Sequence, residues 1–148
     1  ADKPLNPAST MKLITTYAGL DILGPAYRWR TEVYADGPLQ NGVLSGNLIL
    51  KGHGDPSFMA EDLWRLLNSL RQSGVRDIRG DLVLDNRWFD ALQTDAGAFD
   101  YAPHLTYNAP ADALSVNLKA TSVKLTAAGD QVIVSIAPQL PERRVSNP

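Results

Sequence analysis

Cysteine is absent from this 148-residue sequence. Its absence excludes a disulfide framework, a thiolate metal site and a cysteine nucleophile, and it fits the cytosol and the periplasm alike. Long apolar runs are absent too, because the longest one, Leu13–Leu23, is interrupted by Thr15, Thr16 and Asp21. A helix that crosses a bilayer needs roughly 20 apolar residues. We therefore expect a soluble chain without a transmembrane segment.

Neither sign of charge is in excess, since 14 Lys and Arg residues stand against 16 Asp and Glu residues, for a net charge of −2. The two signs are interspersed, so the sequence has no basic footprint for nucleic acid. With 44% hydrophobic and 20% charged residues, the composition is that of one globular domain or two small ones. The chain opens with Ala-Asp-Lys-Pro, without an initiator Met or a signal-peptide pattern, and is expected to be processed or cut from something longer.

Apolar spacing and turn residues predict a mixed α/β (α+β) chain. Residues 10–23 are apolar nearly all round, which is typical of a buried helix, and Gly24-Pro25 ends it. A second, amphipathic helix over 59–70 is predicted to pack on a sheet and to end at Gly74. Residues 86–108 are predicted to form an ordered loop. Strands are predicted over 29–35, 43–51, 81–84, 113–119, 122–126 and 131–136, the first two paired antiparallel.

The first helix begins with a Ser-x-x-Lys motif, Ser9-Thr10-Met11-Lys12, which occurs once in the chain. Residues three apart share a helix face, so the Lys12 amine can reach the Ser9 hydroxyl. A lysine desolvated by apolar surroundings can lose its proton and act as a general base for a serine nucleophile. A four-residue pattern also arises by chance, and the alternative is a serine N-cap followed by a solvated lysine.

The residues on both sides of the motif extend the recognisable pattern well beyond four positions. Residues 6–25, Asn-Pro-Ala-Ser-Thr-Met-Lys-Leu-Ile-Thr-Thr-Tyr-Ala-Gly-Leu-Asp-Ile-Leu-Gly-Pro, resemble the nucleophile helix of the class C low-molecular-mass penicillin-binding proteins. This is the D-alanyl-D-alanine carboxypeptidase/endopeptidase family. The resemblance covers residues 5 to about 120, in the family's order. It is carried by Tyr27–Thr31, Asn41–Leu48, His53–Ser57, Gly74-Val75, Ile78–Asp85, Asn108-Ala109-Pro110 and Ser115–Leu118.

The resemblance implies a catalytic serine, Ser9, and a general base, Lys12. Of the family's three motifs only Ser-x-x-Lys is matched, because Lys-Thr-Gly does not occur and Ser115-Val116-Asn117 is interpreted as part of a predicted strand. The chain therefore resembles an N-terminal fragment. Residues 1–28 would be a piece of the penicillin-binding catalytic domain, and residues 29–148 a mixed-sheet inserted domain.

The activity implied by the resemblance is acyl transfer on peptidoglycan stem peptides, with β-lactams as covalent inhibitors and with no cofactor and no metal. In the family, an aromatic loop helps to recognise the diaminopimelate side chain, which points to Tyr107 as a substrate-binding residue, with Asp100 as the acidic residue near it. The implied location is the bacterial periplasm, compatible with peripheral membrane association. The sequence leaves the oligomeric state undetermined.

Two other functions share parts of this pattern. A serine β-lactamase also carries Ser-x-x-Lys, although the long insertion after the helix is not expected there. A non-catalytic module would bind cell-wall or protein partners through residues 26–148 and leave the serine idle.

Two further groups of residues have both a functional and a structural interpretation. His53, His104 and Asp55 could be taken for a metal or triad set, but His53-Gly54-Asp55-Pro56 is interpreted as a turn in which Asp55 accepts local backbone hydrogen bonds. An aromatic group in the loop is interpreted as core filling rather than a ligand platform; its members are Trp88, Phe89, Phe99 and Tyr101.

Overall fold

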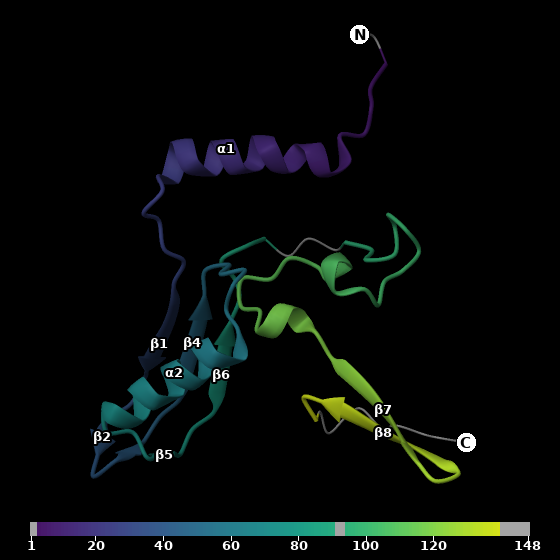
Figure 1. The fold of residues 1–148 in the computed structure, drawn as a ribbon. Coiled ribbons are helices and arrows are strands. Elements are labelled where there is room, and N and C mark those ends of the chain that lie inside the picture. Colours follow the sequence, from purple (N-terminus) through teal and green to yellow (C-terminus); the bar gives the residue numbers. More distant parts are fainter. Residues whose placement is uncertain (1–2, 91–93, 140–148) are drawn as a thin grey trace. The chain divides into compact units, whose positions relative to one another are not determined.

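The computed structural model describes residues 3–90 and 94–139, and the chain divides into two compact units, residues 1–30 and 31–148 (Figure 1). In the first unit, a 3-10 turn (η1, Ala8–Thr10) leads into α1 (Met11–Leu23). Gly24, at a φ of 79°, ends the helix and donates its N–H to the Leu20 carbonyl at 3.1 Å. The predicted helix and its glycine stop are confirmed.

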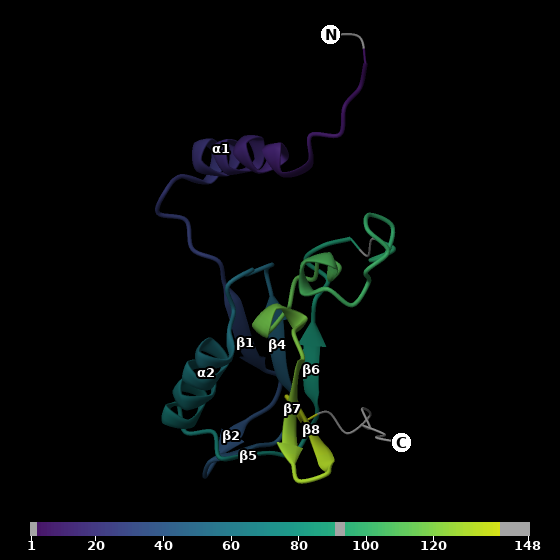
Figure 2. The same cartoon turned by 45° about the vertical axis from the view of Figure 1, so that its right-hand side comes forward.

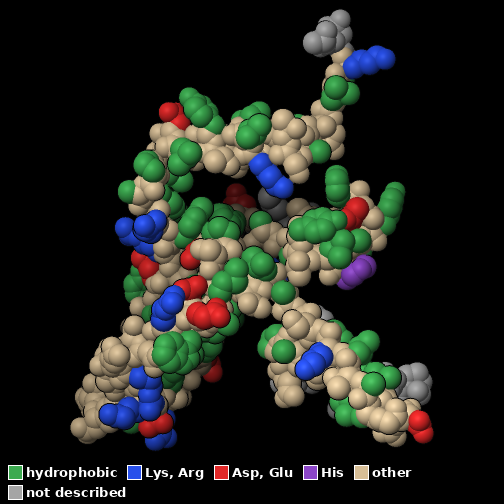
Figure 3. All heavy atoms as spheres, in the orientation of Figure 1, with side chains coloured by type: hydrophobic (Ala, Val, Ile, Leu, Met, Phe, Trp, Pro, Cys, Tyr) green, Lys and Arg blue, Asp and Glu red, His purple; other side chains and the backbone are tan. Residues whose placement is uncertain are grey.

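The prediction that this helix is buried is wrong. No residue of α1 is buried, and Leu13 and Ile22 are 73% and 77% exposed. Figure 3 shows hydrophobic side chains over its surface. The physical reason is that the unit holds one helix and its flanking segments, so it offers no second element against which an all-round apolar helix could pack.

The second unit is built on a three-stranded sheet in the order β1-β4-β6. Strand β1 (Thr31–Ala35) pairs antiparallel with β4 (Leu48–Gly52), with Val33 opposite Leu50. Strand β6 (Leu82–Asp85) pairs parallel with β4. The connection from β4 to β6 contains α2 (Ala60–Gln72), which lies along the sheet (Figure 2). The predicted antiparallel pair and the predicted helix are confirmed.

A smaller sheet holds β2 (Leu39–Gln40), β3 (Val43–Leu44) and β5 (Asp77–Ile78), in that order. Asn41 and Gly42, at φ values of 51° and 83°, form the tight turn between β2 and β3. The single strand predicted over 43–51 is therefore wrong, because β3 and β4 belong to different sheets. Asn47 lies at the break, where its backbone N–H and its side-chain amide donate to Asp36 at 2.5 and 2.8 Å.

The core of this unit lies between the two sheets and α2. Leu44, Leu48 and Val75 are buried together, and Val33 and Leu70 pack against them while remaining partly exposed. A capping box starts α2, since Asp62 accepts the Met59 N–H at 3.1 Å. The capping box and the apolar stripe of α2 both favour a helix here. The helical spacing in the sequence therefore predicted α2 correctly.

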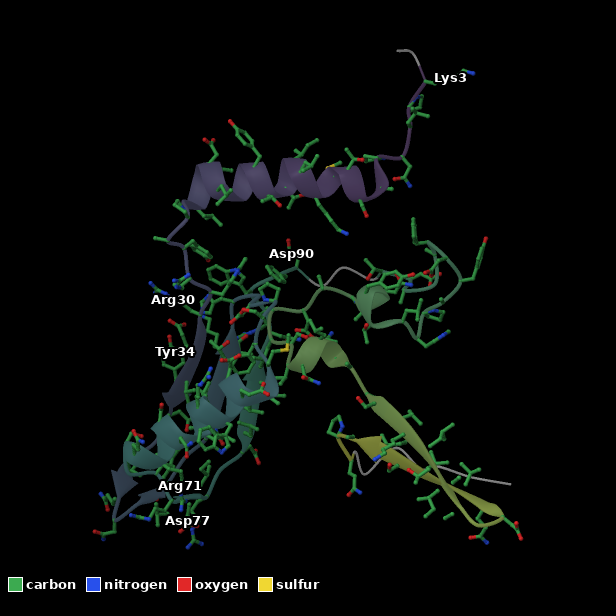
Figure 4. The ribbon with its side chains drawn as sticks, viewed as in Figure 1. Lys3, Arg30, Tyr34, Arg71, Asp77 and Asp90 are labelled. Atoms are coloured by element: carbon green, nitrogen blue, oxygen red, sulfur yellow. The ribbon has the colours of Figure 1, made fainter. Side chains whose placement is uncertain are left out.

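The C-terminal end of α2 is hydrogen-bonded to the residue that precedes β5. Arg71, in the last turn of the helix, donates to the Arg76 carbonyl at 2.9 Å. Figure 4 shows Arg71 and Asp77 at this same end of the helix. Gly74 lies between them at a φ of 100°, a backbone conformation that glycine adopts without steric cost.

The segment that follows β4 is hydrogen-bonded to residues 113–117, which lie far along the chain. Gly54 donates its N–H to the Ala113 carbonyl at 2.8 Å, and Asn117 donates to the Phe58 carbonyl at 3.0 Å. The approach is so close that a Cβ on Gly52 would lie 2.1 Å from the Ala113 carbonyl oxygen. Backbone from two distant parts of the sequence therefore meets at the end of β4.

The returning segment is not the strand predicted over 113–119, so that prediction is wrong. It forms a turn and a short 3-10 segment, η3 (Asn117–Lys119). Asn117, Leu118 and Lys119 have φ values of 52°, 56° and 53°, which are incompatible with a strand. Their backbone hydrogen bonds go to Phe58 and to neighbours within the turn, so tertiary contacts override the alternating pattern.

The last described element is the hairpin of β7 (Ser122–Ala128) and β8 (Gln131–Ala137), which confirms the two strands predicted around Gly129-Asp130. Its register places six apolar residues on one face: Val123, Leu125, Ala127, Val132, Val134 and Ile136. Among the helices in the part of the chain described, none has the length and apolar character required to span a bilayer.

Candidate active site

The motif residues Ser9 and Lys12 meet at the head of α1. Ser9 is the middle residue of η1, and Lys12 follows in the first turn of the helix. Lys12 Nζ donates to Ser9 Oγ at 3.3 Å. The i, i+3 spacing thus produces a direct contact between a hydroxyl and an amine, the arrangement in which a base can take the proton of an attacking serine.

The backbone around Ser9 leaves one donor free. The Thr10 N–H donates to the Pro7 carbonyl at 3.0 Å, and the Met11 N–H donates to the carbonyls of Ala8 and Ser9. Within residues 3–90 and 94–139, the Ser9 N–H donates to no acceptor. A free N–H at the positive end of a helix is suited to receive an oxygen that becomes negative during acyl transfer.

The predicted desolvation of Lys12 is wrong for this structure, because the side chains of Ser9 and Lys12 are both exposed. The same cause applies as for the rest of α1, since its unit contains no second element to cover the helix. The contact between the two side chains therefore comes from local helix geometry alone.

The second pair of predicted residues, Asp100 and Tyr107, also comes together, in the loop that follows β6. Tyr107 Oη donates to Asp100 Oδ2, from the 3-10 turn η2 (Thr106–Asn108). Asn108 Nδ2 and the Ala102 N–H both donate to Asp100 Oδ1, at 2.7 and 2.9 Å. The hydroxyl of Tyr107, followed by the other donors, holds the pKa of the Asp100 carboxyl below its ordinary value.

The carboxylate of Asp100 is held in place by several hydrogen bonds. The backbone N–H of Asp100 itself is a further donor to this carboxylate. The contact between Tyr107 and Asp100 also raises the pKa of Tyr107, because the neighbouring carboxylate opposes loss of the phenol proton. A charged acceptor beside an exposed aromatic ring is suited to bind a ligand that carries an ammonium group on an apolar chain.

The two pairs belong to different units, Ser9 and Lys12 to residues 1–30, and Asp100 and Tyr107 to residues 31–148. Sequence reasoning missed two supporting residues. Asn108 orients Asp100 in the second pair, and Asn6 accepts the Ala8 N–H at 2.9 Å beside the first. The Asn6-Pro7 dipeptide is a signal for the second of these, because Asn before Pro favours a turn that its own side chain stabilises.

His53 is engaged in another interaction. Its Nε2 lies 2.7 Å from Glu32 Oε2, and its ring lies against that of Trp88 with the centroids 4.4 Å apart. Asp55 accepts the Ser57 N–H at 2.9 Å, which confirms the predicted turn. Within the described residues there is no group of three His, Cys, Asp or Glu side chains that could hold a metal ion.

The prediction that the loop aromatics fill a core is wrong. Trp88 and Phe99 are 57% and 71% exposed, and Tyr101 is 91% exposed. Phe89 is the partial exception, since its ring packs over Gly54, where a Cβ would lie 2.4 Å from the ring. Phe99 and Tyr101 lie on irregular backbone, whereas the Trp88 ring lies against His53.

Comparison with known proteins decides the family. The model of the family described as D-Ala-D-Ala carboxypeptidase 3 (S13) matches residues 1–147. The chain belongs to the S13 family. The resemblance inferred from the motifs is thereby confirmed.

This S13 chain is 40% identical over 113 residues to a D-alanyl-D-alanine carboxypeptidase of an Actinomadura species, covering 76% of the chain and 21% of the relative. It is 31% identical over 137 residues to the D-alanyl-D-alanine carboxypeptidase DacB of Haemophilus influenzae, covering 90% of the chain and 29% of the relative. The S13 chain thus spans less than a third of the length of these relatives.

Solved structures give the same result for the fold. Penicillin-binding protein 4 of Haemophilus influenzae matches with a TM-score of 0.77 and 31% identity, over 93% of this S13 chain and 31% of that protein. The same protein in complex with a novel β-lactam matches with a TM-score of 0.64 and 29% identity, over 91% of this chain and 27% of that protein. The predicted mixed α/β fold class is confirmed.

Proposed function

We propose that this chain supplies the nucleophile segment of a serine D-Ala-D-Ala carboxypeptidase/endopeptidase that acts on peptidoglycan stem peptides. The observation that carries the proposal is the contact of Lys12 Nζ with Ser9 Oγ at 3.3 Å, at the head of a helix in a chain of the S13 family. The division into a catalytic piece over 1–28 and an inserted domain over 29–148 belongs to this proposal, as does a periplasmic location.

In the proposed reaction, Ser9 Oγ attacks the carbonyl carbon between the two terminal D-alanines, while the neutral amine of Lys12 takes the hydroxyl proton. The free N–H of Ser9 donates to the oxygen that becomes negative. The C–N bond then breaks, the terminal D-alanine leaves as an amine after receiving a proton, and an acyl-enzyme remains on Ser9. Water hydrolyses this ester and restores the serine.

A β-lactam would follow the first half of this route. Ser9 Oγ attacks the lactam carbonyl, the ring C–N bond opens, and its nitrogen takes the proton, so the product stays attached as an ester of Ser9. The β-lactam complex of penicillin-binding protein 4 supports this part of the proposal, because that structure is 29% identical to this chain over 91% of its length.

Substrate recognition is assigned to the loop pair. Tyr107 and Asp100 would contact the diaminopimelate side chain of the stem peptide, whose ammonium group is opposite in charge to the Asp100 carboxylate. The exposure of Tyr107, 68%, leaves its ring accessible to a ligand.

A fluorescent penicillin tests the nucleophile. The label is applied to the longer protein that carries this chain and to the chain itself, each as wild type, as Ser9→Ala and as Thr10→Ala. We expect a stable label on the longer protein that Ser9→Ala abolishes and Thr10→Ala retains, because the Thr10 hydroxyl makes no contact with Lys12 among the described residues. Absence of label on the longer protein would refute the peptidase. Rapid penicillin turnover without a stable adduct would indicate a β-lactamase.

A further inference from the structure

We propose that Asn6 is a positioning residue for Ser9: its side chain holds Ala8 in the left-handed region and so sets the direction of the serine that follows. This inference rests on the proposed function, in which Ser9 is the nucleophile. The observations are that Asn6 Oδ1 accepts the Ala8 N–H at 2.9 Å and that Ala8 has a φ of 44°.

Alanine does not favour this conformation intrinsically. Its Cβ is crowded at positive φ, and its side chain carries no polar group that could compensate locally, as those of Asn and Asp do. Strained residues of this kind persist where surrounding contacts hold them, and they concentrate at functional sites. Here the restraint acts from both sides, because Asn6 binds the Ala8 N–H and Met11 donates to the Ala8 carbonyl.

The strained residue directly precedes Ser9, so its dihedral angles decide where the Ser9 N–H and Cβ point. With Ala8 at a φ of 44°, the Ser9 N–H has no acceptor within residues 3–90 and 94–139, and Ser9 Oγ meets Lys12 Nζ. If Ala8 relaxed to negative φ, the peptide plane before Ser9 would turn. The free N–H and the hydroxyl would then leave their present directions together.

Ordinary helix capping does not account for Asn6. The cap positions are Pro7 for η1 and Thr10 for α1, and neither makes a side-chain cap hydrogen bond. Asn6 lies before both positions and binds the strained residue itself. A capping role predicts loss of helix when Asn6 is replaced, whereas a positioning role predicts loss of acylation with the helix intact.

The acylation experiment uses the longer protein that carries this chain and measures the second-order rate with a fluorescent penicillin. We expect Asn6→Ala to lower the rate about tenfold, the size of effect that one lost orienting contact has on a barrier. Asn6→Asp keeps the acceptor oxygen and is expected to retain most of the rate. Asn68→Ala, at a partly buried asparagine on α2, is the matched control and is expected to leave the rate unchanged.

A double variant separates positioning from stabilisation. Glycine adopts positive φ without the Cβ penalty, so adding Ala8→Gly to Asn6→Ala is expected to recover most of the lost rate. A merely structural role predicts the opposite, because glycine adds flexibility at the head of a helix. Circular dichroism checks that the helix content of every variant is equal.

A measurement on the 148-residue chain tests the restraint without any reaction. A strong NOE between the amide proton and the Hα of Ala8 marks positive φ and is expected in the wild type and in Asn6→Asp, but weakened in Asn6→Ala. An unchanged NOE in Asn6→Ala, an unchanged acylation rate, or a further loss in the double variant would each overturn the inference. A wild type that takes no label at Ser9 refutes the proposed function instead, and the NOE then decides whether Asn6 holds Ala8.

Discussion

Leu44 offers the sharpest test of how the second unit is held together. Its side chain is 0% exposed, and it packs with Leu48 and Val75 in the small core under α2. Leu44→Ala removes three carbons from this contact. Substitutions of this kind cost about 2–5 kcal/mol, and the cost falls when neighbours can collapse into the space. Val33 and Leu70 line the core and are only partly buried, so they can move inward. We therefore expect a loss of roughly 2–3 kcal/mol in the free energy of unfolding.

Urea denaturation followed by circular dichroism measures this loss. With a typical slope for a small protein, the midpoint is expected to fall by about 1 M, with the slope unchanged. Leu84→Ala is the matched control, because it makes the same chemical change at a residue of β6 that is 61% exposed. The free energy of unfolding of this control is expected to fall by less than about 1 kcal/mol. Equal losses of unfolding free energy in the two variants would refute the conclusion that Leu44 belongs to the core.

The other predictions concern two hydrogen-bonded carboxylates. The His53 contact, first among its causes, lowers the pKa of Glu32 below 4.5, so this pair stabilises the folded chain above that pH and the stabilisation is lost as pH falls through the lower folded pKa. The stability gap between wild type and Glu32→Gln is expected to shrink below about pH 4.5, and a gap that stays constant in urea titrations from pH 7 to pH 3 would contradict it. Tyr107→Phe removes the main cause of the lowered pKa of Asp100, so an NMR titration should show that pKa rising toward its ordinary value, whereas an unchanged value would disprove the contact.

Local signals in the sequence predicted the parts of the fold that local physics decides. Asn41-Gly42 and Gly129-Asp130 form turns where the sequence places them, because their residues tolerate positive φ. The apolar spacing of residues 59–70 predicted α2, because one stripe of that helix packs on a core. The same reasoning missed β2 and β5, which are two residues long and carry no periodicity.

Non-local contacts defeated the remaining predictions. Residues 113–119 alternate like a strand, but their backbone is bound by Gly54 and Phe58, which are distant in sequence. The helix over 10–23 is apolar enough to be buried, yet composition cannot say which element would cover it. In both cases the deciding partner lies outside the window that a pattern covers.

The candidate site divides in the same way. The contact between Ser9 and Lys12 follows from i, i+3 spacing on one helix, so it was predictable from the residues. Asp100 and Tyr107 are seven residues apart in an irregular loop, where no period brings side chains together. The resemblance to a family pointed to that pair, and the hydrogen bonds of Asn108 and Ala102 explain how the loop holds it.

The hydrogen bond between Gly54 and Ala113 anchors the end of the loop that follows β6 to the segment just after β4. The loop leaves the sheet at the end of β6 and is bound again beside the end of β4, so residues added to or removed from it lie outside the paired segments of β1, β4 and β6. Doubling the length of a flexible loop costs only about 0.6 kcal/mol in closure entropy. The loop that carries Asp100 and Tyr107 can therefore vary in length while the sheet keeps its register.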